Sequence, residues 1–157
     1  MNRQVSHVGF CIAVLVALVV APARADVTGK PQVIDGNTLD IAGERIRLYG
    51  IAAPAPDQTC TADGAEWPCG QEAMYALVFE TAYHWVTCKG DNRDQAGHLI
   101  AVCTIGPYDL AALMVRKGWA LADRRYASDY ADEEEEAKAA TRGLWRGEFV
   151  PPWEWRR

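Results

Sequence analysis

Short alternating runs of apolar and polar residues occupy the stretch from Val33 to Pro54. Turn-forming residues at 35–38 and 42–44 divide this stretch into three groups. The apolar positions are Val33, Ile34, Leu39, Ile41, Ile46, Leu48 and Ile51. Alternation over a few residues between Gly, Asp and Asn turns is typical of half-buried strands. The pattern therefore predicts a three-strand meander of the kind that begins a small β-barrel.

Helical spacing follows at three places. Met74, Leu77, Val78 and Thr81 predict an amphipathic helix over residues 71–81. Leu110, Leu113 and Met114 predict a second helix, with Asp109 as its N-cap and Gly118 as its stop. A third helix is expected over residues 129–141, because acids come first, basic residues come late and Gly143 follows.

A hairpin is predicted between the first two helices. Its strands contain Trp85, Val86 and Cys88 on one side and residues 99–103 on the other, with a polar loop over residues 89–97. Strands followed by separate helices predict an α+β fold, with about three helices packed on the barrel. The acidic run 133–136 is interpreted as a solvated helix face, because consecutive helical residues point in different directions.

The first 25 residues have the pattern of a secretory signal peptide. Arg3 precedes an apolar run over residues 8–20, and the small residues Ala23 and Ala25 stand just before Asp26. That run is short for a membrane span, and the small residues are typical of a cleavage site. We expect a signal peptide over 1–25 and one domain over 26–157, with no membrane span after cleavage. An uncleaved anchor is the alternative.

Charge and cysteine content limit the function. The predicted mature chain has 157 − 25 = 132 residues and 16 − 2 = 14 Lys+Arg against 21 Asp+Glu, a net charge of −7. Nucleic-acid binding depends on neutralising phosphates with Lys and Arg, so this charge opposes it. Four cysteines in an exported domain favour two disulfides, Cys60 with Cys69 and Cys88 with Cys103. Free thiols or a four-cysteine metal site are the alternatives.

The opening stretch resembles the signature of the staphylococcal nuclease-like (thermonuclease homologue) family, an Asp-Gly-Asp-Thr turn followed by an Arg-Leu-x-Gly-Ile-Asp-x-Pro-Glu segment. The matching residues are Asp35, Gly36, Thr38, Arg47, Leu48, Gly50, Ile51 and Pro54. Further matches occur at 69–73, 94–97, 110–120 and 140–145. The resemblance implies a five-stranded OB-fold β-barrel. The cysteine-bearing form resembles an exported branch of Gram-negative bacteria, with members associated with exopolysaccharide (succinoglycan) production, which implies a periplasmic or secreted protein.

The resemblance also implies a catalytic site with substituted residues. In the family, two aspartates and a backbone carbonyl hold calcium, a glutamate acts on the water, and two arginines bind the phosphate. The metal positions here are Asn37, Ala52 and Ala53, the glutamate position is Ala55, and the arginine positions are Arg47 and His98. Only Arg47 keeps its family type.

We therefore expect a pseudoenzyme, a non-catalytic binding or structural module linked to exopolysaccharide production. No cofactor is expected, and Ca²⁺ only if the family site retains function. The alternative is a weakened or rewired metal-dependent endonuclease that cleaves DNA or RNA with Arg47, Asn37, His98 and a carboxylate such as Asp57. The family implies nucleic acid as a partner and the charge opposes it. A protein partner, or a polysaccharide bound by exposed tryptophans, remains open.

Overall fold

The computed structural model describes residues 26–125 and 128–155. The predicted signal peptide lies outside the described residues. The strands of the main sheet are β1 (Val27–Gly29), β2 (Gln32–Asp35), β3 (Thr38–Ile41), β4 (Glu44–Leu48), β8 (Val86–Arg93), β9 (Leu99–Ile105) and β10 (Tyr108–Asp109). Among the described residues, no helix is long and apolar enough to cross a bilayer.

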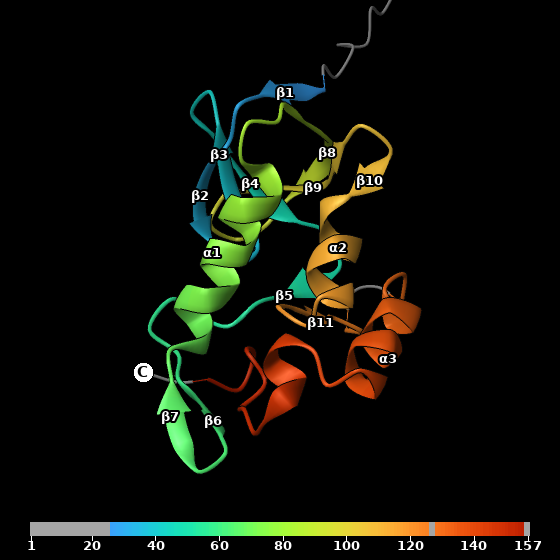
Figure 1. Cartoon of the computed structure of the whole chain (residues 1–157). Helices are drawn as coiled ribbons and strands as arrows, with labels where there is room; N and C mark the ends of the chain where they lie inside the picture. Colours follow the sequence, from blue (N-terminus) through green and yellow to red (C-terminus); the bar gives the residue numbers. More distant parts are fainter. Residues whose placement is uncertain (1–25, 126–127, 156–157) are drawn as a thin grey trace, which may run out of the picture.

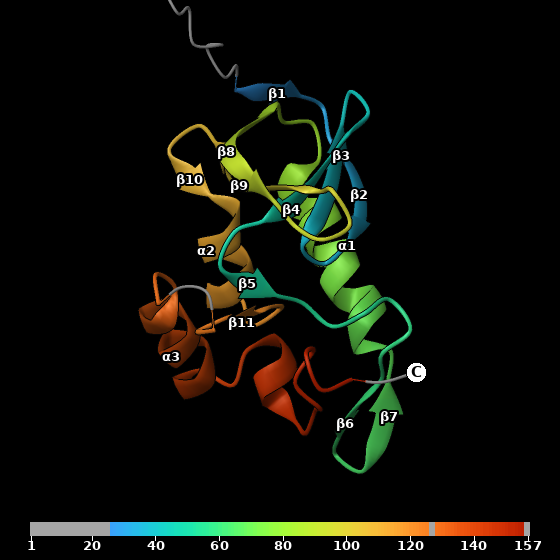
Figure 2. The same ribbon diagram turned by 180° about the vertical axis from the view of Figure 1, so that it is seen from behind.

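The main sheet has the strand order β1-β8-β9-β4-β3-β2, and β10 pairs with β9. The strands β4 and β9 run parallel, whereas the adjacent pairs β3–β4 and β8–β9 are antiparallel (Figures 1 and 2). The run β2-β3-β4-β9-β8 is the five-stranded OB arrangement, and β1 and β10 are short additions to it. The predicted meander and hairpin are confirmed.

The three predicted helices are present: α1 (Cys69–Thr81), α2 (Leu110–Arg116) and α3 (Ala131–Ala139). The helices α1 and α2 pack on this sheet, whereas α3 packs against α2 and β11. Two small pairs of strands complete the fold. They are β5 (Ile51–Ala52) with β11 (Leu121–Ala122), and β6 (Cys60–Ala62) with β7 (Ala65–Trp67). The hairpin β6–β7 was not predicted. It lies beside the 3₁₀ helix Gly143–Arg146 and the chain that follows (Figures 1 and 2).

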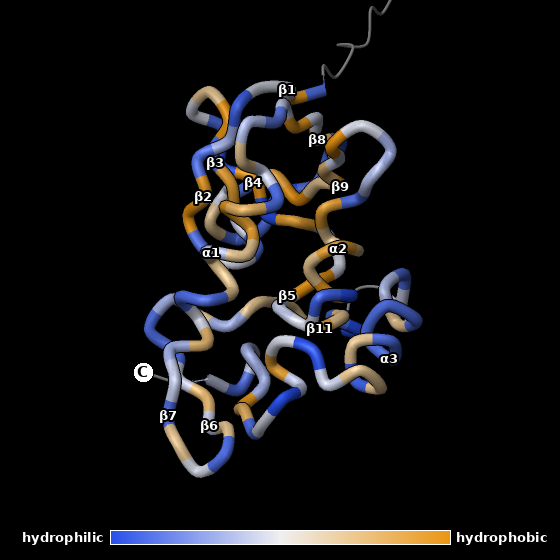
Figure 3. Tube along the Cα trace, viewed as in Figure 1, coloured by the Kyte–Doolittle hydropathy of each residue, from blue (hydrophilic) through white to orange (hydrophobic). Residues whose placement is uncertain are grey.

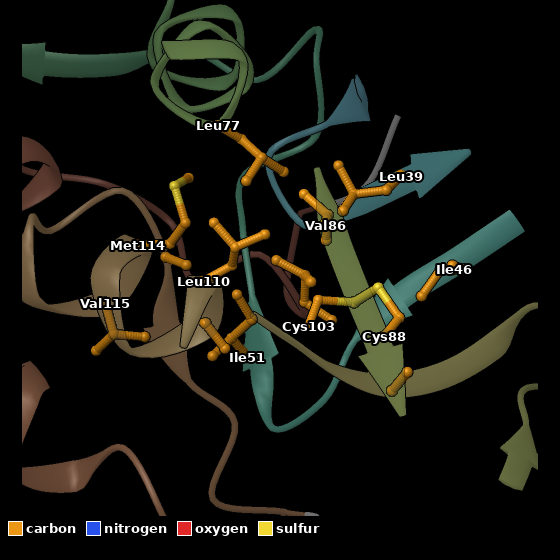
Figure 4. Packing of buried hydrophobic residues seen from close by; sticks show 14 of the residues in the cluster. Leu39, Ile46, Ile51, Leu77, Val86, Cys88, Cys103, Leu110, Met114 and Val115 are labelled. Atoms are coloured by element: carbon orange, nitrogen blue, oxygen red, sulfur yellow. A yellow bond between two sulfur atoms is a disulfide. The ribbon is translucent and has the colours of Figure 1, made fainter. Parts of the chain in front are cut away.

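The core lies between the sheet and the helices α1 and α2. Leu39, Ile46, Val86, Leu110 and Met114 are buried there around the Cys88–Cys103 disulfide (Figure 4). Apolar residues concentrate in the main sheet and α2, whereas α3 is mostly hydrophilic (Figure 3). Burial of these side chains, about 1.5–3 kcal/mol each, is the main stabilising term.

Both predicted disulfides are present. Cys88 and Cys103 face each other in the register of β8 and β9, and Cys60 joins Cys69 across the base of the β6–β7 hairpin. Cys60 and Cys69 pack with Leu144 in a second, smaller core. This second core ties the C-terminal segment to the start of α1.

Three details of the sequence prediction are wrong. The buried stripe of α1 is Ala73, Leu77 and Thr81, and Val78 is exposed, because the helix rests its small residues on the sheet. The strand β8 continues to Arg93, through the expected polar loop, because its pairing with β9 resumes after a bulge.

The third error concerns the acidic run. Glu134 is only 6% exposed. Its carboxylate accepts a hydrogen bond from the Ala122 amide at 3.0 Å and pairs with Arg124 and Lys138. One residue of the run therefore faces inward and fastens α3 to β11.

Candidate functional site

A cavity of about 410 Å³ opens beside β4. The turn after β2, the chain after β5, the β8–β9 loop and the C-terminal segment contribute its walls. All six positions that the family resemblance assigns to the site line this cavity: Asn37, Arg47, Ala52, Ala53, Ala55 and His98. The structure thus brings the predicted site residues together, although they are spread over residues 37–98 of the sequence.

The turn between β2 and β3 places Asn37 at the cavity. The Asp35 carboxylate accepts a hydrogen bond from the backbone N–H of Asn37 at 2.9 Å, which is the turn-stabilising bond expected of an aspartate there. Asn37 is 6% exposed, and its Nδ2 donates to the Ile51 carbonyl at 3.2 Å. A Cβ at Gly36 would lie 2.6 Å from that of Ala53, so the turn can approach this chain only with glycine there.

The chain after β5 presents methyl groups and proline rings to the cavity. It passes from β5 toward the start of α1 (Figure 2). The Ala55 carbonyl accepts the Gln58 amide at 2.8 Å, and the Gln58 carbonyl accepts the Gly70 amide at 3.0 Å. A Cβ at Gly70 would lie 1.7 Å from the Ala55 oxygen. The first turn of α1, fixed by the Cys60–Cys69 disulfide, therefore holds this wall in place.

Arg45 and Arg47 project from the same face of β4, since they are two residues apart in one strand. Both are exposed and both line the cavity. Within the described part of the chain, neither guanidinium takes part in an ion pair. The other described arginines pair with acids or stack on tryptophan; they are Arg93, Arg116, Arg124, Arg125, Arg142 and Arg146.

The β8–β9 loop places His98 at the cavity through Asp94. One Asp94 oxygen accepts the backbone amides of Ala96 and His98, each at 2.9 Å, and the other lies 3.0 Å from His98 Nδ1. Partial burial disfavours the charged carboxylate, but these hydrogen bonds outweigh it and lower the pKa of Asp94. An ionised Asp94 favours the tautomer in which Nδ1 carries the hydrogen, and this leaves the lone pair on Nε2.

A further charged group beside the cavity was not predicted from the sequence. Asp123 is 3% exposed and follows β11, where its amide donates to the Gly50 carbonyl at 2.9 Å. Arg125 donates to its two oxygens at 2.9 and 2.8 Å. These bonds, with a smaller effect from the charge of Arg47, outweigh burial and lower the pKa of Asp123. The signal in the sequence was an aspartate directly after an apolar run and before two arginines.

Arg125 also reaches the C-terminal segment. Its guanidinium lies 4.9 Å from the ring centroid of Trp153, and both residues line the cavity. Trp153 is 39% exposed. The cavity wall therefore combines a held guanidinium with an accessible indole.

Asp57, which the endonuclease alternative needs, is exposed and not part of the cavity lining. Asp35 and Asp94 are the lining carboxylates among the described residues. Within residues 26–125 and 128–155, no group of three or more His, Cys, Asp and Glu side chains has an arrangement that could hold a metal ion.

Comparison with known proteins finds a family model and several relatives. Residues 45–147 match the family model described as staphylococcal nuclease homologue. The chain is 34% identical over 143 residues to the succinoglycan biosynthesis protein ExoI of Rhizobium meliloti (strain 1021), covering 87% of this chain and 75% of that protein.

Two further relatives carry nuclease names. The probable staphylococcal-like nuclease CAN3 of Oryza sativa subsp. japonica is 33% identical over 116 residues, covering 72% of this chain and 28% of that protein. The probable endonuclease LCL3 of Schizophyllum commune (strain H4-8 / FGSC 9210) is 29% identical over 118 residues, covering 64% and 39%. The chain therefore spans much less than half the length of these two relatives.

Proposed function

This chain belongs to the staphylococcal nuclease homologue family, and we propose that it is a member whose cavity binds an anionic ligand without cleaving phosphodiesters. The observation that carries this proposal is the set of side chains at the cavity. Arg47 remains at an arginine position of the family, whereas Asn37, Ala52 and Ala55 stand where the family has carboxylates.

These residues do not fit a calcium ion. Calcium takes about six to eight oxygen ligands, and several of them are usually carboxylates. Here Ala52 offers a methyl group, and the amide nitrogen of Asn37 is bonded to the Ile51 carbonyl. The oxygens left at the metal positions are neutral, from Asn37 and the Ala53 backbone. A group of this kind supplies too little charge to displace the water around a hard cation.

The base for hydrolysis is also missing at its family position, since Ala55 cannot accept a proton. Loss of one preorganised catalytic group typically costs about 10²- to 10³-fold in rate, and such losses are not additive. A weakened or rewired endonuclease remains the second candidate. One observation favours it: the Asp94–His98 pair places a ring nitrogen at the cavity that Arg47 lines.

We further propose that the protein is exported to the periplasm or beyond, and that it acts in exopolysaccharide production. Two disulfides support export, because disulfides persist in oxidising compartments. The relative named for succinoglycan biosynthesis supports the pathway, and its match covers most of both chains. The net charge of −5 for the whole chain supports a partner other than nucleic acid.

A cleavage assay tests the proposal. The purified protein is incubated with single-stranded DNA and with RNA, each in calcium, magnesium, manganese or chelator. We expect no cleavage above a buffer control in any condition. Metal-dependent cleavage that disappears in Arg47→Ala would overturn the non-catalytic proposal. If that metal-dependent cleavage also disappears in His98→Ala, it would support the second candidate.

A further inference from the structure

The two arginines of β4 point to the chemistry of the ligand. We propose that the cavity binds a carboxylate-bearing sugar, with Arg45 and Arg47 on the carboxylate and Trp153 against the sugar ring. This inference rests on the proposed function, because it takes the cavity as an anion-binding site. It adds Arg45 and Trp153, which the family resemblance does not assign to the site.

Charge around the cavity favours a ligand with one negative charge. Asp35 and Asp94 accept hydrogen bonds from backbone amides of their own turns, and Asp123 is paired with Arg125. Neither Arg45 nor Arg47 forms an ion pair among the described residues; Asp123, on which the charge of Arg47 has a small effect, is bonded to Arg125. Planar guanidinium groups match a carboxylate, which can accept two parallel N–H bonds. A polyanion would also meet the repulsion of an acidic chain.

The rest of the lining suits a sugar ring. Methyl groups come from Ala53 and Ala55, a proline ring comes from Pro56, and an indole comes from Trp153. Tryptophan offers a large apolar face with a polar edge, which matches the mixed C–H and O–H surface of a pyranose. The volume of about 410 Å³ is within the range of roughly 300–1,000 Å³ typical of small-molecule sites. One or two sugar units would fill such a cavity.

Calorimetric titration with three probes tests this inference. They are an oligosaccharide containing one glucuronate residue, the same oligosaccharide with that residue replaced by glucose, and a short DNA oligonucleotide. We expect the acidic oligosaccharide to bind at least about 10-fold more tightly than the neutral one, because hydrogen bonds to charged groups are worth about 10- to 100-fold. Equal binding of both oligosaccharides would overturn the inference.

Variants identify the contacts. Arg45→Ala should weaken binding of the acidic oligosaccharide about 10-fold or more while leaving the neutral one unchanged, and Trp153→Ala should weaken both. Arg93→Ala and Trp85→Ala are matched controls, because these residues are exposed outside the cavity lining. Thermal melting checks that each variant is folded, and Arg45→Lys, which keeps the charge, replaces Arg45→Ala if that variant unfolds. The inference would be overturned if Arg45→Ala bound the acidic oligosaccharide with wild-type affinity. If Arg45→Lys is used, the inference would be overturned by an equal loss of affinity for the neutral and the acidic oligosaccharide.

The outcomes separate this inference from the proposed function. If the oligonucleotide binds through Arg47 uncleaved and neither oligosaccharide binds, the anion-binding proposal stands and the sugar inference fails. If the oligonucleotide is cleaved, the non-catalytic proposal fails whatever the oligosaccharides do. If no probe binds, both proposals are wrong.

Discussion

Restoring the family side chains should give the cavity a calcium site. The variant combines Asn37→Asp, Ala52→Asp, Ala55→Glu and His98→Arg. All four positions line the cavity, and the chain around them keeps the family's turn, glycine and proline positions. The two new aspartates and the Ala53 carbonyl would then supply the oxygen ligands that the present residues lack.

The magnitude follows from the contacts that change. Without calcium, loss of the Asn37–Ile51 hydrogen bond, with a carboxylate now facing that carbonyl, should cost about 1–3 kcal/mol. For a dissociation constant of about 0.1–1 mM, calcium at about 10 mM should return about 1.4–2.7 kcal/mol. In a domain of roughly 130 residues this corresponds to a rise in Tm of about 5–10 °C.

Scanning calorimetry with calcium, magnesium or chelator measures this rise, and isothermal titration measures binding directly. The matched control keeps Ala52 and carries the other three substitutions, so it lacks one carboxylate ligand. We expect its calcium response to be much smaller. A folded quadruple variant that binds no calcium would refute the assignment of these positions, and an equal calcium response in the wild-type protein would refute the proposed loss of the site.

Three further predictions concern the walls of the cavity. Gly70→Ala should destabilise the protein by several kcal/mol, because its Cβ would lie 1.7 Å from the Ala55 oxygen, and urea denaturation would measure the loss. Replacing Cys60 and Cys69 by serine should cost about 2.6 kcal/mol for their separation of 9 residues, measured the same way. The pKa of Asp123 is lower in the folded protein than in the unfolded chain, where it is about 3.9. The ionised Asp123 therefore stabilises the fold above that pH, and this contribution is lost as the pH falls through the pKa of the folded protein. Asp123→Asn should therefore make the stability less dependent on pH below about pH 4, measured by urea titrations at several pH values.

Each of these predictions has its own control. Gly64→Ala meets no atom within 4 Å and should cost only about 1 kcal/mol for its left-handed backbone; an equal loss at Gly70 would contradict the close approach. A reductant opens both disulfides, so it should destabilise the wild-type protein more than the two serine substitutions do, and the serine variant should lose only the part that belongs to Cys88–Cys103. Asp132→Asn, in an exposed first turn of α3, should keep the wild-type acid dependence. The same acid slope in Asp123→Asn would show that another group controls it.

Local chemistry explains which parts of the fold were predictable. The turn at Asp35, the N-cap at Asp109 and the strand alternation depend on neighbours in sequence, and the structure has them where they were predicted. The buried face of α1 and the inward turn of Glu134 depend on the surface each helix meets, so residue spacing alone misplaced them. Asp123 was missed for the same reason, because the pairing of β5 with β11 brings it beside the cavity.

The substitutions at the cavity are consistent with one another. In a family site with all its residues, two aspartates and a glutamate carry three negative charges. Calcium carries two positive charges and the two arginines carry two more, which leaves an excess of one positive charge. Here Arg47 gives a similar excess with no acid at the three positions, and Arg45 adds to it. The Asn37–Ile51 hydrogen bond joins the turn to β5, so this wall keeps its shape without a bridging ion. Under the proposed function, a cavity without acids at these three positions and without a metal keeps an attraction for anions and lacks the groups that would activate water.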